Sequence, residues 1–152
     1  MTVNLGYLRS DGSVGASTQN SYTNKFNCEG YDFLTVLAAV WRTVEPCCQF
    51  FGDNDVFLES FQFEKDTNLT NTPEKIYFIR IPTGAKSFRT TCYKNYKDKW
   101  FALLATDNEY KSIVDNHLYS YKTIRPTWSG GELYKHIRFV SWFSGMFREV
   151  RI

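Results

Sequence analysis

The predicted fold depends on the stretch Cys28-Glu-Gly-Tyr-Asp-Phe-Leu-Thr-Val-Leu-Ala-Ala-Val-Trp-Arg-Thr-Val-Glu-Pro46, which opens the region 28–51. Its apolar side chains recur at three- and four-residue steps, the period of a helix: Phe33, Leu37, Val40, Trp41 and Val44. Asn27 or Asp32 can cap the start of such a helix, because a short side-chain oxygen accepts hydrogen bonds from the first free amides. Pro46 ends the run, since its ring cannot continue the hydrogen-bond ladder. We therefore expect a buried helix over Tyr31–Val44.

Strand-forming patterns follow the stretch along the chain. Alternating apolar side chains and β-forming residues favour strands over Val56–Phe63, Lys75–Ile81, Ser87–Lys94, Trp100–Thr106, His117–Ile124 and Glu132–Trp142. Pro82-Thr-Gly84 predicts a turn that joins two of these strands as a hairpin. The sequence thus predicts an α+β domain, in which one central N-terminal helix packs on a mostly antiparallel sheet of five or six strands.

The chain divides in composition near residue 27. Residues 1–26 are poor in large apolar side chains and contain a small, polar, glycine-bearing segment, Ser10–Ser21. This composition is typical of a flexible or partly extended arm. Residues 27–152 contain the predicted core elements. We expect them to form a single globular domain, since their number suits one hydrophobic core.

Composition narrows the class of protein. The chain has 152 residues, of which 43% are hydrophobic and 18% aromatic, so a packed fold is expected rather than disorder. The N-terminus lacks the basic and apolar regions of a signal peptide, and no run is long enough to span a membrane. We expect an intracellular protein without membrane insertion. Its four cysteines form no CxxC pair and it has two histidines, so neither a metal site nor a cofactor is predicted.

Charge is distributed unevenly along the chain. Residues 1–74 carry 4 Lys/Arg and 10 Asp/Glu, a net charge of −6, whereas residues 75–152 carry 14 and 6, a net charge of +8. Such asymmetry indicates an anionic partner or self-association between unlike faces. The alternative is that the two halves interleave in the fold and neutralise each other locally.

A first set of candidate site residues contains the side-chain types of a thiol hydrolase's catalytic site: a cysteine, a histidine and an acidic residue. Cys28 at the start of the predicted helix would have a lowered pKa, because free helix amides favour the thiolate. His117 can then act as base, and Glu132 can orient it. The order of a cysteine on an early helix and a histidine on a later strand resembles papain-like cysteine proteases. That family commonly has an aromatic residue after the cysteine, where this chain has Glu29.

A second set is basic and aromatic. Cations neutralise phosphates and exposed rings stack on unpaired bases, so their mixture favours single-stranded nucleic acid. The residues are Lys86, Arg89, Tyr93, Lys94, Tyr96, Lys97, Lys99 and Trp100. The structural alternative is a solvated, lysine-rich strand edge that prevents edge-to-edge pairing.

A third set points to a protein interface. Aromatic residues and methionine are enriched at the centres of interfaces. Here they gather toward the C-terminus: Trp128, Trp142, Phe143, Met146 and Phe147. The alternative is that these side chains complete the core. Together with the absence of an enzyme motif, this set favours a non-enzymatic binding protein that acts through protein contacts, with a protein partner or a second copy. In size and aromatic content the chain resembles small viral or phage accessory proteins.

Overall fold

The computed structural model describes residues 3–39, 47–63, 74–92, 100–108 and 148–150. Its strands are β1 (Asn4–Leu5), β2 (Tyr7–Leu8), β3 (Val14–Gly15), β4 (Ser21–Tyr22), β5 (Phe26–Asn27), β6 (Phe33–Ala39), β7 (Cys47–Phe51), β8 (Phe57–Gln62), β9 (Glu74–Arg80), β10 (Ser87–Thr90), β11 (Phe101–Ala105) and β12 (Arg148–Val150). A short 3-10 turn, η1 (Asp53–Asp55), lies between β7 and β8. No helix of 7 or more residues occurs within the described ranges, which are mostly β-structure.

The predicted central helix is wrong, because Phe33–Ala39 forms strand β6. β6 pairs with β9 on one side and with β11 on the other, so it lies inside a sheet. Its side chains are buried on both faces, with Leu34 and Val36 on one and Phe33 and Thr35 on the other. A strand buried on both sides is apolar at nearly every position, so residues at helical spacing are also apolar. The end of the predicted helix lies outside the described residues.

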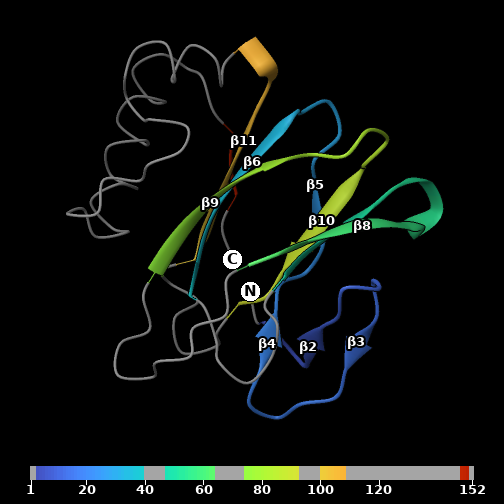
Figure 1. Cartoon of the computed structure of the whole chain (residues 1–152), viewed down its shortest axis with the longest axis vertical. Coiled ribbons are helices and arrows are strands. Elements are labelled where there is room, and N and C mark those ends of the chain that lie inside the picture. The colour runs from blue at the N-terminus through green and yellow to red at the C-terminus, as the bar shows by residue number, and fades with distance from the viewer. Residues whose placement is uncertain (1–2, 40–46, 64–73, 93–99, 109–147, 151–152) are drawn as a thin grey trace.

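Two four-stranded antiparallel sheets replace the single sheet and covering helix of the predicted α+β fold (Figure 1). The strand order is β5-β10-β7-β8 in the first sheet and β12-β11-β6-β9 in the second. All pairings within both sheets are antiparallel. The chain crosses between the sheets several times, so neither sheet is built from one continuous segment.

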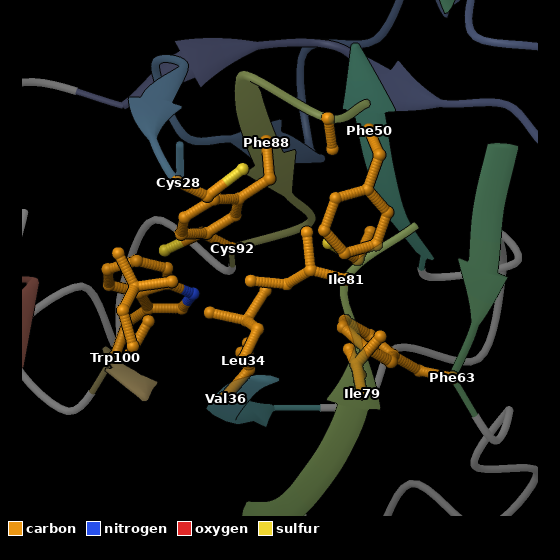
Figure 2. Close-up of a cluster of buried hydrophobic side chains, with 14 residues drawn as sticks. Cys28, Leu34, Val36, Phe50, Phe63, Ile79, Ile81, Phe88, Cys92 and Trp100 are labelled. Carbon is orange, nitrogen blue, oxygen red and sulfur yellow. The ribbon is translucent and has the colours of Figure 1, made fainter. Parts of the chain in front are cut away.

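The two sheets enclose one apolar core (Figure 2). Phe50 and Phe88 come from neighbouring strands of the first sheet and point toward Leu34 and Ile81. Phe50, Phe88 and Leu34 are each 0% exposed. Burial of one such side chain contributes about 1.5–3 kcal/mol. Burial of apolar side chains between the two sheets therefore stabilises the fold, in place of the predicted packing of a helix on one sheet.

The N-terminal strands pack against the first sheet on the side away from this core. β1 pairs with β4, and β2 pairs with β3. The buried Gln49 side chain on β7 donates to the carbonyl oxygens of Arg9 (2.7 Å) and Ser13 (3.0 Å). Arg89 on β10 donates to the amide oxygen of Gln49 (2.7 Å) and to the carbonyl oxygen of Gly12 (3.1 Å). These bonds attach the β2–β3 hairpin to the sheet.

In contrast to the helix, strands predicted after the quoted stretch are present in the structure. β8, β9, β10 and β11 occupy predicted positions, and the predicted turn after β9 is present, with Ala85 N–H donating to the Pro82 carbonyl oxygen (3.1 Å). The predicted hairpin across that turn is wrong, because β9 pairs with β6, whereas β10 pairs with β5 and β7 in the other sheet. The strands predicted over 117–124 and 132–142 lie outside the described residues. The division of the chain at residue 26 stays a prediction.

Candidate binding site at the edge of a sheet

Strand β8 lies at one end of the first sheet, where β7 is its described neighbour. The register of β7 fixes which way the backbone groups of both strands point. Thr91 N–H donates to the Cys47 carbonyl oxygen (2.9 Å), so the backbone groups of Cys47 face β10. Backbone groups of successive residues point to opposite sides of a strand. Those of Cys48 and Phe50 therefore face β8.

The outward side of β8 follows from its partners. Phe61 is opposite Cys48 and Glu59 is opposite Phe50, so the backbone groups of Phe61 and Glu59 face β7. Ser60 and Gln62 alternate with them along the strand. Their N–H and C=O groups consequently point away from the sheet, where no described strand pairs with them. An edge of this kind is a template for pairing with another strand.

Exposed apolar side chains accompany these backbone groups. Val56 is 59% exposed and Leu58 is 39% exposed, in contrast to the buried phenylalanines of the neighbouring strands. Leu58 lies beside the turn after β9, because a Cβ placed on Gly52 would be 3.3 Å from both a Leu58 methyl carbon and the Gly84 carbonyl oxygen. We call the outward groups of Ser60 and Gln62, with Val56 and Leu58, the β8 edge.

The segment that carries this edge is acidic. Residues 53–62 contain Asp53, Asp55 and Glu59 and no Lys or Arg. Asp55 forms an ion pair with Lys25 (3.1 Å). Asp53 and Glu59 have no ion pair with a described residue. The edge thus combines backbone groups that no described strand pairs with, exposed apolar side chains and negative charge.

The side chains of β8 do not follow the single apolar face that its sequence predicts. Glu59 and Phe61 share the core side of the sheet with Phe50. Phe57 does not share this side. A register irregularity between Phe50 and Phe51 places Phe57 opposite Phe51. The two rings meet there edge to face, with centroids 6.0 Å apart. Glu59, which breaks the apolar alternation in the sequence, is therefore directed toward the space at the end of the core.

A cavity of about 650 Å³ occupies that space. Its lining comes from the turn before β6, from β8 and from the β9–β10 connection: Glu29, Gly30, Tyr31, Asp32, Glu59, Arg80, Ile81, Pro82, Thr83, Gly84, Ala85 and Lys86. Ile81 and Ala85 are each 8% exposed and Tyr31 is half-buried, so part of the wall is apolar. We call this space the Glu59 cavity. Its volume is in the range of small-molecule pockets.

The two cations of the cavity rim already have partners. Lys86 donates to and forms an ion pair with Glu29. Arg80 is 3.4 Å from a carboxylate oxygen of Asp107. Asp32 accepts a hydrogen bond from the Asp107 N–H (2.8 Å). Among the described residues, neither Asp32 nor Glu59 has a cationic partner.

The proposed catalytic cysteine lies in a different environment from the one expected. Cys28 is 0% exposed, and it precedes a turn rather than a helix, with Tyr31 N–H donating to its carbonyl oxygen (3.2 Å). Burial, helped by the negative charge of Glu29, raises the pKa of the Cys28 thiol to about 11. The residues after Cys28 form a turn and strand β6, so no first turn of a helix supplies free amides that would lower this pKa. His117 and Glu132 lie outside the described residues, so their part in the hydrolase hypothesis stays a prediction.

We expect Cys28 to react slowly with iodoacetamide in the folded protein. A pKa of about 11 leaves roughly 100-fold less thiolate at pH 8 than an ordinary thiol has. The measurement is mass spectrometry of the labelled peptide against time, with the urea-unfolded chain as control. Rapid labelling of Cys28 at pH 6, lost in His117→Ala, would contradict the buried environment and favour the hydrolase.

Three of the proposed nucleic-acid-binding residues fall on described positions, and all three have partners within the chain. Lys86 pairs with Glu29, and Arg89 holds Gln49 and Gly12. Burial lowers the pKa of the Arg89 guanidinium. Trp100 is 3% exposed and its indole N–H donates to the Thr90 hydroxyl oxygen (2.8 Å). Tyr93, Lys94, Tyr96, Lys97 and Lys99 lie outside the described residues, so the site as a whole stays a prediction.

The proposed interface residues are also outside the described ranges: Trp128, Trp142, Phe143, Met146 and Phe147. Sequence reasoning missed both the β8 edge and the Glu59 cavity. Exposed Val56 and Leu58 beside an acidic turn were the available signal for the edge. No signal was available for the cavity, because residues 29–32, 59 and 80–86 meet only through the fold.

No group of three or more potential metal-ligating side chains is found within the described ranges. Likewise, none of the helices in that part of the chain is both long and apolar enough to cross a membrane. Comparisons with protein families, with curated proteins and with solved structures find no match to this chain.

Proposed function

We propose that this chain is a small non-enzymatic binding protein, and that an extended segment of a protein partner pairs with the β8 edge. The observation that carries the proposal is the outward orientation of the Ser60 and Gln62 backbone groups on β8, the last strand of the first sheet among the described residues. In strand addition, main-chain hydrogen bonds supply affinity and alternate side chains supply specificity. Exposed Val56 and Leu58 add apolar contact area beside the strand.

The charge of the edge indicates the chemistry of the partner. Residues 53–62 carry three acidic side chains and no basic one, so a basic segment is electrostatically complementary to them. Residues 75–152 of this chain carry a net charge of +8. A second copy of the chain is therefore one source of such a segment, and sedimentation velocity distinguishes it from a different protein.

An intracellular setting is part of the proposal. It is supported by Cys28 and Cys48, whose buried thiols are free. Secreted proteins usually pair their cysteines as disulfides, whereas intracellular thiols are kept reduced.

Proline at position 60 should block the edge without disturbing the sheet. Because the Ser60 N–H points away from β7, Ser60→Pro removes a docking donor and no hydrogen bond of the internal ladder. Loss of that bond, with the ring in the path of the incoming strand, should weaken binding at least about tenfold. The measurement is fluorescence anisotropy of a labelled hexapeptide of alternating lysine and valine, called below the lysine–valine peptide.

Ser60→Ala is the matched control for this change. Both variants lose the hydrogen bond from the Ser60 hydroxyl to the Ser10 carbonyl oxygen (2.9 Å), but alanine retains the outward N–H. We expect Ser60→Ala to bind like the parent, and urea unfolding to show that both variants are folded. Equal binding by folded Ser60→Pro and Ser60→Ala, or no binding of the peptide to the parent at low salt, would overturn the proposal.

A further inference from the structure

The Glu59 cavity opens beside the strand to which the proposed partner would bind. Glu59 belongs both to β8 and to the cavity lining. In an antiparallel pair, residues directly opposite each other direct their side chains to the same face of the sheet. A residue of an added strand opposite Glu59 therefore directs its side chain to the core face, where the cavity lies.

The cavity wall suits a long side chain with an apolar stem. Ile81 and Ala85 present buried apolar surface, and the half-buried Tyr31 ring lies in the same lining. Lysine and arginine pack their methylene stems on apolar surface while the charged end remains near water or a counter-charge. Gly30 and Gly84 also belong to the lining, and a Cβ on either would meet no atom within 4 Å.

The rim charges favour a positive end group. Lys86 and Arg80 are each paired with a carboxylate, on Glu29 and Asp107 respectively. Glu59 and Asp32 are the rim carboxylates without a cationic partner among the described residues. An incoming ammonium or guanidinium group finds acceptors there, whereas an incoming carboxylate would have to compete for cations that already have partners.

We propose that the Glu59 cavity receives a lysine or arginine side chain of the segment that pairs with β8. This inference rests on the proposed function and adds a rule of specificity to it. Main-chain pairing accepts an extended segment, and the cavity selects those with a basic residue at the position opposite Glu59. Cross-strand pairs of opposite charge contribute modestly, so the cavity sets preference rather than most of the affinity.

The test is a double-mutant cycle between peptide and protein. Norleucine, which retains a four-carbon apolar stem and lacks the ammonium group, replaces each lysine of the lysine–valine peptide in turn. At one position the replacement should weaken binding to the parent about threefold to fivefold. The same replacement should have a clearly smaller effect on binding to Glu59→Gln, because only the Asp32 carboxylate then remains as an acceptor in the cavity.

Asp55→Asn is the control for long-range charge. It removes one carboxylate from the same hairpin but not from the cavity, so the norleucine effect should persist in it. Peptides that bind the parent equally well with lysine or norleucine at every position would overturn the cavity assignment and leave strand pairing intact. The same norleucine effect in the parent and in Glu59→Gln would also overturn it. Failure of strand pairing itself appears separately, in the comparison of Ser60→Pro with Ser60→Ala.

Discussion

The Leu34→Asp variant is expected to be unfolded at room temperature. Leu34 is 0% exposed on the central strand β6, and in Figure 2 it lies between the two sheets. A carboxylate there would lie within the cluster of buried apolar side chains, and an unpaired charge in such a site costs several kcal/mol. A domain of this size is stable by about 5–15 kcal/mol in total. Far-UV circular dichroism and intrinsic fluorescence against urea concentration measure the loss.

Leu5→Asp is the matched control, because it makes the same chemical change at a residue that is 57% exposed. It should unfold at nearly the urea concentration of the parent. In strand β6 the side chain of Leu34 is directed into the core. A Leu34→Asp protein as stable as the parent would contradict the sandwich of two sheets.

The Phe88→Ala variant is expected to lose about 3–5 kcal/mol of its free energy of unfolding. Phe88 lies on β10, between β5 and β7, and its ring is 5.7 Å from that of Phe26 and 6.4 Å from that of Phe50, measured between centroids. It is 0% exposed, so truncation removes buried apolar surface and leaves a cavity in the core. Urea denaturation measures this loss of free energy. The slope of the free energy against urea concentration should match that of the parent, as expected for two-state unfolding.

Leu5→Ala serves as the control for this truncation, since removal of an exposed side chain should change stability by no more than about 0.5 kcal/mol. A loss below about 1 kcal/mol for Phe88→Ala would mean that its ring is not part of a packed core. Such a result would also remove the basis for packing the first sheet against the second.

The partly exposed strand β8 and the strand β9 were easier to predict from the sequence than the buried strand β6. Alternation over Val56–Phe63 and β-forming residues over Lys75–Ile81 identified β8 and β9, because each has a chemical signal within a few residues. β6 has no such signal. With both faces of the strand buried, Leu34, Thr35 and Val36 give a continuous run that periodicity alone does not separate from a helix. The β-branched pair Thr35 and Val36 favours a strand, but two residues do not outweigh the helical spacing of the apolar residues around them.

Pairing was less predictable than strand position. Pro82-Thr-Gly84 specifies a turn, and turn chemistry does not say whether the chain returns to the same sheet or crosses to the opposite one. The partners of β9 and β10 are decided by which apolar faces meet across the core, an effect between residues distant in sequence. For the same reason, the spacing of Glu59 from Lys86 or Asp32 along the chain gave no indication of their shared cavity.

Amide hydrogen exchange along β8, followed residue by residue with and without the lysine–valine peptide, tests the open edge most directly. The account predicts that in the free protein the amides of Ser60 and Gln62 exchange much faster than those of Glu59 and Phe61, whose N–H groups face β7. It also predicts that bound peptide slows exchange at Ser60 and Gln62 by at least about tenfold. Equal protection of all four amides in the free protein, or unchanged exchange at Ser60 when the peptide is bound, would contradict strand pairing at this edge.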